Sequence, residues 1–262
     1  MCGATLVAPN FVLTAAHCLL DEFAFAGWQY YLNVEVGKLC FLSEDLEGDN
    51  CGQKLEVFGV DAIYTHPNFT SPYYSEDNVP FSYDVALIRL NGNSTIDPIA
   101  IDDGALYPTY DENTSLWVAG TGTTIGSDMT TLSPRLLHSE FMFDVGETKC
   151  KEEYTEIDAT EMCVKGKGEG TNIGAGDSGT PIYDKENKVV VGVGGWSAYG
   201  NSSAVFAKLA NQDMFGWIKE TICENSDPEL VVDFCKEAQT DPPSKAPKSS
   251  KAPKSSKAPK SS

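Results

Sequence analysis

The sequence predicts an all-β fold, a barrel or a sandwich that carries one short helix. The first observation is a series of short apolar runs separated by stretches rich in Gly, Asn, Asp and Pro, a pattern typical of strands joined by turns. The second is that one segment, residues 212–222, spaces its apolar residues as a helix does. Hydrophobic residues make up 41% of the 262 positions, which is enough for a sizeable core. No uninterrupted apolar run is long enough to cross a bilayer, so we expect no membrane span.

Apolar runs dominated by Val, Leu, Ile and Phe are predicted to be the main strands. In chain order they are residues 11–13, 57–60, 85–90, 116–119 and 189–193. In the segment 212–222 the larger apolar residues fall on one side of a helix, so we expect that helix to lie on the barrel. Those residues are Met214, Trp217, Ile218 and Ile222.

The chain divides into a body and two short additions. Residues 1–222 hold the predicted strands and the helix, and residues 223–240 carry the last two cysteines, so we expect a disulfide-clipped extension there. Residues 241–262 contain the sequence KAPKSS three times and no large apolar side chain, which predicts a disordered tail. The tail is a solvated spacer, an O-glycosylated segment or an attachment to an acidic wall or matrix. A chain that ends on a complete repeat also fits an incomplete gene model.

Charge is divided unevenly between these parts. The chain has a net charge of −19, and six of its 19 basic residues lie in the tail, so the body is more acidic than the whole. An acidic body repels nucleic acid and anionic membranes at long range, and we expect neither as a partner.

Eight cysteines and four glycosylation triplets indicate an oxidising compartment. The cysteine number is even and no CxxC pair occurs, which favours disulfides over a zinc site. The triplets begin at Asn68, Asn93, Asn113 and Asn201. We therefore expect a secreted glycoprotein. Because no signal peptide follows Met1, we also expect that the natural N-terminal segment is missing from this sequence.

A candidate nucleophile, Ser178, lies in the glycine-rich stretch GAGDSGTPIY at residues 174–183. A serine hydroxyl attacks only when a base removes its proton, and histidine suits that task near neutral pH. His17 follows a run of small residues, His66 lies in a turn-like segment and is expected to be structural, and His138 has no recognisable context. Asp84 opens an otherwise apolar strand, where an unpaired carboxylate is costly, so we expect it to have a partner. Each residue alone also fits a purely structural role.

Together, three segments resemble the chymotrypsin/trypsin-like serine peptidase family. CGATLVAPNFVLTAAHC at residues 2–18 is similar to the family's histidine block, YDVALIRL at 83–90 to its aspartate block, and GDSGTP at 176–181 to its serine block. The blocks stand in the family's order, and the resemblance covers about residues 2–222. It implies two antiparallel six-stranded β-barrels with the site in the cleft between them, with the first strand missing here. It also implies a serine-type endopeptidase.

The resemblance assigns a role to each motif residue. Ser178 would attack the peptide carbonyl, His17 would take its proton, and Asp84 would orient His17. The backbone N–H groups of Gly176 and Ser178 would form the oxyanion hole. Asp177 would pair with the ammonium of an N-terminus released by activation cleavage. A protein or peptide substrate would lie extended along Gly195, Trp196 and Ser197, and this chemistry requires no cofactor and no metal.

The disulfide pairing follows partly from the same resemblance. The family supports two pairs, Cys2–Cys18 and Cys150–Cys163. Subtraction leaves two more, Cys40–Cys51 and Cys223–Cys235. The acidic run at residues 44–49 is either a solvated loop or a calcium ligand set.

Several positions depart from the family's pattern. Asn172 falls on the expected floor of the specificity pocket and Ala204 narrows its wall, so we expect neutral side chains to be preferred. Gly195 stands where active members usually have a serine that supports the triad aspartate, a change that should tune activity, and Thr180 is a milder one. No activation N-terminus precedes residue 2, so we expect a protein that starts at Met1 to be poorly active or inactive.

Two functions from different classes stay open on the sequence alone. All three triad residues favour a secreted serine endopeptidase. The altered pocket and Gly195 leave room for a non-catalytic homologue that binds a partner, as the glucanase inhibitors secreted by some plant pathogens do. A cell-wall structural protein would explain the lysine-rich tail but not the body.

Overall fold

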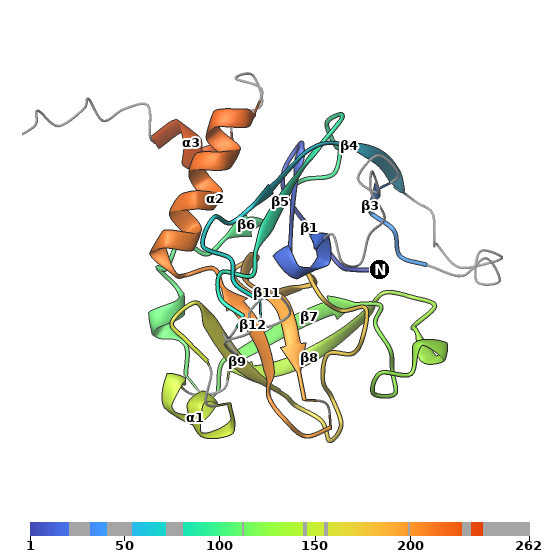
Figure 1. The fold of residues 1–262 in the computed structure, drawn as a ribbon, viewed down its shortest axis with the longest axis vertical. Helices are drawn as coiled ribbons and strands as arrows, with labels where there is room; N and C mark the ends of the chain where they lie inside the picture. Colours follow the sequence, from blue (N-terminus) through green and yellow to red (C-terminus); the bar gives the residue numbers. More distant parts are fainter. Residues whose placement is uncertain are drawn as a thin grey trace, which may run out of the picture.

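The computed structural model arranges the chain as two β-sheet units with helices at one side (Figure 1). It describes residues 1–20, 32–40, 54–71, 81–111, 113–143, 146–154, 157–198, 200–226 and 232–237. The predicted tail and the acidic run at residues 44–49 lie outside this part of the chain, so both predictions about them stay predictions.

The N-terminal half forms a five-stranded antiparallel sheet in the order β1-β2-β5-β4-β3. Its core packs Val12, Ile88 and Leu90, which stand on neighbouring strands, against partly buried apolar side chains of β3 and β4. The strand bounds are β1 Thr5–Ala8, β2 Phe11–Thr14, β3 Asn33–Val36, β4 Glu56–Thr65 and β5 Ala86–Leu90.

The second half closes into a six-stranded barrel because β10 pairs with β7 on one side and with β11 on the other. Fully buried Leu116, Ile182 and Phe206 fill its interior. A two-residue strand, β6 Ala100–Ile101, adds to β11 in parallel and stands outside the barrel's antiparallel order. The barrel strands are β7 Ser115–Gly120, β8 Leu137–Phe143, β9 Glu161–Gly166, β10 Pro181–Asp184, β11 Val189–Ser197 and β12 Ala204–Lys208.

One helix ties the two units together. α2, Gln212–Asn225, begins where the Asn211 side chain accepts a hydrogen bond from the Met214 N–H, a standard N-cap. Its fully buried residues, Met214, Ile218 and Ile222, join a core cluster that also contains residues of β1, β2, β5, β11 and β12. The predicted helix is therefore present and extends three residues beyond residue 222.

The remaining helices are short. α1, Gly146–Glu153, precedes β9, and α3, Asp233–Glu237, follows α2. Three 3₁₀ turns complete the described elements: η1 Ala16–Leu19, η5 Tyr107–Thr109 and η6 Met129–Thr131. Among the described residues, no helix is long and apolar enough to cross a membrane.

The predicted all-β fold of two units is confirmed: the second unit is a closed six-stranded barrel, and the first is an open sheet of five strands, in keeping with the expected loss of its first strand. Each of the apolar runs predicted as strands lies in or overlaps β2, β4, β5, β7 or β11. The structure forms three of the expected disulfides: Cys2–Cys18, Cys150–Cys163 and Cys223–Cys235. Cys51 lies outside the described residues, so its pairing with Cys40 stays a prediction.

Candidate active site

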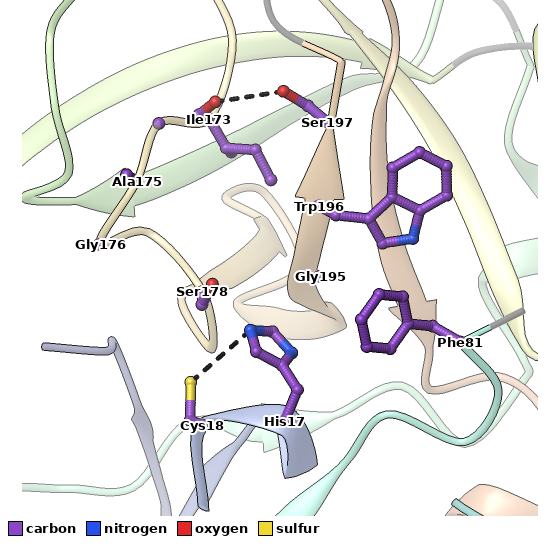
Figure 2. Close-up of a pocket in the computed structure, with 11 residues that line it drawn as sticks. His17, Cys18, Phe81, Ile173, Ala175, Gly176, Ser178, Gly195, Trp196 and Ser197 are labelled. Atoms are coloured by element: carbon purple, nitrogen blue, oxygen red, sulfur yellow. Dashed lines mark hydrogen bonds between the residues drawn. The ribbon is translucent and has the colours of Figure 1, made fainter. Parts of the chain in front are cut away.

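A pocket of about 400 Å³ lies where the 3₁₀ turn η1, the loop 173–178 and the end of β11 meet (Figure 2). His17 and Ser178, which lie far apart in the sequence, both line it. The other lining residues are Cys18, Phe81, Ile173, Gly174, Ala175, Gly176, Gly195, Trp196 and Ser197. The structure therefore gathers the predicted base, the predicted nucleophile and the predicted substrate strand around one opening.

His17 and Asp84 form a close pair at this pocket. The ring Nδ1 of His17 lies 2.6 Å from Asp84 Oδ2, and the His17 backbone N–H donates to Asp84 Oδ1 over 2.9 Å. η1 begins right after β2 and Asp84 immediately precedes the strand run of β5, so the β2–β5 pairing brings the two residues together. Both oxygens of the buried carboxylate are used, which fixes the imidazole in one orientation.

The electrostatic balance around His17 favours its protonated form. Burial lowers the pKa of His17, but the charge of Asp84 and its hydrogen bond outweigh burial and raise the pKa above its ordinary value. The ring can therefore accept a proton near neutral pH, and the imidazolium that results is stabilised by a buried carboxylate. Phe81 packs against the ring with centroids 5.7 Å apart and shields this pair.

Ser178 stands in a tight turn. The backbone at positions 176 and 179 of this turn has a conformation that favours glycine. Gly176 and Gly179 have φ values of +99° and +80°. At Gly179 a β-carbon would lie 2.3 Å from the carbonyl oxygen of Gly3, so no side chain fits there. Figure 2 shows the Ser178 side chain next to the His17 ring. Within the described residues no hydrogen bond joins these two side chains in this structure.

The turn also leaves two backbone donors available. Gly176 and Ser178 line the pocket, and among the described residues neither N–H group is used in an internal hydrogen bond. The Ser178 carbonyl, by contrast, accepts from the Gly3 N–H over 2.7 Å, which fixes the turn against the N-terminal segment. Two free N–H groups beside a serine could bind an oxyanion.

Asp177 does not line the pocket. Its carboxylate stabilises the loop 173–178 through hydrogen bonds with backbone N–H groups. Its Oδ1 accepts from the Gly122 N–H over 2.7 Å and its Oδ2 from the Gly174 N–H over 2.9 Å. Burial raises the pKa of Asp177, and these backbone hydrogen bonds offset the rise only in part. The pairing of Asp177 with a released N-terminal ammonium stays a prediction.

The residues predicted to shape specificity separate into two groups. Gly195, Trp196 and Ser197 line the pocket as predicted, whereas Asn172 and Ala204 are not among its lining residues. The Asn172 amide turns to the backbone instead, donating to the Ser202 carbonyl over 2.9 Å. Buried Ala204 packs in the barrel core. Asn172 therefore does not present its amide to the pocket in this structure.

Ile173, the residue after Asn172, lines the pocket. Its side chain is 5% exposed, packs with Ala204 in the barrel core and also lines the pocket. Figure 2 shows it in the space between the loop 173–178 and β11. The Ser197 hydroxyl donates to its carbonyl over 3.3 Å, which holds the two walls together.

Two further features of the triad region concern Gly195 and Glu161. A β-carbon at Gly195 would lie 4.0 Å from Asp84 Oδ2, so the hydroxyl of a serine there would be within reach of the Asp84 carboxylate. Glycine provides no such hydroxyl.

Glu161, which the sequence analysis did not single out, accepts a hydrogen bond from the Trp196 indole Nε1 over 3.2 Å. The only signal for it was an acid at the start of the apolar run EMCV.

The two other histidines lie outside the pocket. His66 is buried and stacks on Tyr83 with ring centroids 4.4 Å apart, which fits the structural role expected for it. His138 lies beside Tyr183, with 2.8 Å between Nδ1 and the phenol oxygen. Among the described residues no group of three or more His, Cys, Asp or Glu side chains is placed to hold a metal ion.

Comparisons with known proteins place this geometry in a family. The family model described as Trypsin matches residues 1–218. CLIP domain-containing serine protease B10 of Anopheles gambiae is 25% identical over 84% of this chain and 61% of its own length, so the chain spans less than two thirds of that relative. Serine protease 1 of Rattus norvegicus is 26% identical over 86% of this chain and 81% of its own length.

A solved structure shares the fold. Mouse neuropsin, a serine protease expressed in the limbic system of the brain, aligns with a TM-score of 0.66 at 22% identity, covering 84% of this chain and 88% of the neuropsin chain. The match of the family model over most of the chain, together with this fold, shows that the chain belongs to the trypsin family of serine peptidases.

Proposed function

We propose that the protein is a serine endopeptidase that hydrolyses peptide bonds through Ser178, His17 and Asp84. The observation that carries the proposal is that His17, joined to Asp84 over 2.6 Å, lines the same pocket as Ser178. A buried carboxylate that orients a histidine beside a pocket-lining serine is the arrangement that activates a hydroxyl for acyl transfer.

Acylation begins with the attack of Ser178 Oγ on the carbonyl carbon of the scissile bond, while His17 Nε2 takes the hydroxyl proton. Asp84 keeps the proton on Nδ1, so Nε2 is the free base, and its charge stabilises the imidazolium. The carbonyl oxygen becomes an oxyanion, for which the N–H groups of Gly176 and Ser178 are available. His17 then protonates the leaving amine, the C–N bond breaks, and an ester with Ser178 remains.

Deacylation repeats these steps with water. His17 removes a proton from a water molecule, the hydroxide adds to the ester carbonyl, and the tetrahedral intermediate collapses. The Ser178 oxygen leaves and regains its proton from His17, which releases the acid product and restores the enzyme. Each step uses the side chains and backbone donors that line the pocket, together with Asp84, which holds His17.

We further propose that the side chain before the scissile bond must be small and uncharged. A substrate extended along Gly195–Ser197 would direct that side chain between β11 and the loop 173–178, where Ile173 already occupies space. No charged side chain lines this part of the pocket among the described residues, so Arg and Lys would lose their hydration without a partner. Glycine, alanine and serine fit these constraints best.

Secretion is part of the proposal. Three disulfides join cysteines of the described chain, which requires an oxidising compartment. The four triplet asparagines, Asn68, Asn93, Asn113 and Asn201, are all exposed, so each is accessible to glycosylation. Extracellular proteins or peptides would then be the substrates.

The test is hydrolysis of a peptide library by the full chain, before and after limited proteolysis, compared with Ser178→Ala and with Ser202→Ala as a serine control outside the pocket. We expect cleavage after small residues by the parent and by Ser202→Ala, and its complete loss in Ser178→Ala. Cleavage that persists in Ser178→Ala would contradict the proposal. A folded parent without any turnover, even after limited proteolysis, would point to a binding homologue instead.

A further inference from the structure

A buried carboxyl group, that of Glu161, lies behind the substrate-binding strand. Glu161 begins β9 and is 7% exposed. Its Oε1 accepts from Trp196 Nε1, while its Oε2 is buried without a hydrogen-bond partner. Burying a charged oxygen without a hydrogen-bond partner costs much free energy, so the site favours the neutral acid.

The sheet explains how Glu161 reaches the pocket wall. On β12, Ala207 stands opposite Glu161, and Val205 stands opposite both Cys163 and Trp196. The Glu161 side chain therefore crosses β12 diagonally to meet the indole. Tyr154 packs edge-on against the same indole with ring centroids 4.7 Å apart, and its hydroxyl donates to the Ser203 carbonyl over 2.7 Å.

The charges around Glu161 are mostly negative. The segment before β9 contributes Asp158, and the segment before β5 contributes Asp84 with its partner His17. β12 carries Lys208, but its ammonium lies over the Tyr107 ring at 5.0 Å from the centroid. On the side of α1, Glu153 accepts from the Ser203 N–H over 2.8 Å. Within the described part of the chain no cation forms an ion pair with Glu161.

On balance, these surroundings favour the protonated form of Glu161. Burial raises its pKa to about 8, and the charges of Asp158 and Asp84 add to the rise, while the hydrogen bond from Trp196 and the backbone N–H of Asp158 oppose it. The acid is therefore neutral at pH 7 and gains a charge in mildly alkaline solution, beside the carboxylate that supports His17.

We propose that Glu161 is a positioning residue, whose neutral carboxyl group fixes the Trp196 indole as a wall of the substrate pocket. This inference rests on the proposed peptidase function. Loss of the proton leaves a charged oxygen without a donor, and the side chain can relieve that state by moving out or by admitting water. Either response releases the indole, so substrate binding weakens above pH 8 while the triad stays in place.

Two substitutions separate the hydrogen bond from the charge. Glu161→Gln keeps the oxygen that accepts from Trp196 and cannot ionise, so its KM should match the parent at pH 7 and should not rise with pH. Glu161→Met removes the acceptor, so its KM should be raised at least several-fold at pH 7 as well. In the parent, KM should rise at least several-fold between pH 7 and pH 9 with little change in kcat.

A second readout does not depend on turnover. We expect the tryptophan fluorescence of the full chain carrying Ser178→Ala to show a pH step with a midpoint near 8, and the step to vanish when Glu161→Gln or Trp196→Phe is added. A step that persists in Glu161→Gln overturns the inference, and so does a KM that is unchanged by Glu161→Met. If the chain without substitutions shows the fluorescence step but hydrolyses no peptide, the proposed peptidase function is contradicted. The inferred role of Glu161 in fixing the Trp196 indole is then still supported.

Discussion

Asp84 supplies the charge on which the basicity of His17 depends. We expect Asp84→Asn to lower kcat/KM by about 10⁴-fold, the loss known for this change in the family's triad and not one calculated for this chain. Without the carboxylate, burial alone acts on His17 and lowers its pKa. Because the base works only when neutral, activity is lost as pH falls through that pKa, and the acidic limb of the kcat/KM profile should move to lower pH.

The control for this prediction is Asp61→Asn. Asp61 forms a half-exposed ion pair with Arg89, so its loss costs little. It should leave both the plateau and the acidic limb of the profile unchanged. An Asp84→Asn variant with the parent's profile would mean that Asp84 does not support the base.

Ile173 is predicted to set the size limit of the primary pocket. Ile173→Ala should raise kcat/KM for substrates with Leu or Phe before the scissile bond at least tenfold relative to substrates with Ala there. The same change removes buried methyl groups and should cost about 2–5 kcal/mol of unfolding free energy. Chromogenic peptide kinetics and denaturant unfolding measure the two effects.

Ile182→Ala is the matched control, because Ile182 lies fully buried in the same core cluster and is not among the pocket-lining residues. It should lose similar stability and keep the parent's preference. If both variants shift the preference equally, general loosening of the barrel explains the change and Ile173 has no special role.

Among single residues, those that stand in sequence motifs were predictable, and those that act through packing were not. Ser178, His17 and Asp84 were found because their neighbours are short, recognisable patterns. Asn172 was placed on the pocket floor by counting, but backbone carbonyls nearby satisfy its amide. Glu161 could not be found, because its link to Trp196 crosses a strand that stands between them only in the folded sheet.

Among the elements, the clip formed by α2, α3 and the Cys223–Cys235 disulfide stabilises the helix that joins the two units. Replacing both cysteines with serine should lower the unfolding free energy by about 2–4 kcal/mol, the typical value for a disulfide. Because none of the clip residues itself lines the pocket, kcat/KM at 25 °C should stay within about twofold of the parent. Thermal unfolding and peptide kinetics on the same samples test both statements.

Replacing Cys2 and Cys18 provides the contrast. This disulfide adjoins His17, so its removal should reduce kcat/KM as well as stability. Equal losses of activity in the two double variants would argue against a purely stabilising role for the C-terminal clip.

Strands with several apolar residues were predictable, and elements held by tertiary contacts were not. β6 has two residues and exists because it pairs with β11 in parallel. α1 is a short polar helix with no apolar periodicity to announce it. α3 has five residues and owes its place to the disulfide and to the Phe215–Phe234 contact, whose ring centroids are 6.4 Å apart.

For the whole molecule, Glu161 links stability to pH. Its ordinary pKa is 4.5 and its pKa in the fold is about 8, so between these values the folded chain holds a proton that the unfolded chain has lost. Unfolding free energy should therefore fall as pH rises through this window, by about 1.4 kcal/mol per pH unit for this one group. Glu161→Gln should remove this fall, as denaturant unfolding at pH 5, 6.5 and 8 would show.

Glu140→Gln serves as the control for this measurement. Hydrogen bonds from Lys167 and Ser115 lower the pKa of Glu140, so its contribution to stability is present above its ordinary pKa and is lost only as pH falls below it. The Glu140→Gln variant should keep the parent's fall between pH 5 and 8. A parent whose stability does not fall in this window would contradict a neutral Glu161.

The architecture as a whole was predictable from the resemblance of three sequence blocks, which implied two barrels with one strand missing. What the blocks did not contain is how the units share a core: α2 packs against strands of both, through Met214 and Ile218. That arrangement places the loop 173–178 of the barrel opposite η1 of the N-terminal sheet, and the pocket forms where these two segments meet the end of β11.

The most direct test of the central claim is fluorophosphonate labelling of the protein from its natural source, with the adduct located by mass spectrometry. The probe reacts only with a serine whose base and oxyanion donors are in place. We predict one adduct, on Ser178, that is lost when His17 is replaced by alanine. A folded protein that stays unlabelled, before and after limited proteolysis, would contradict the account.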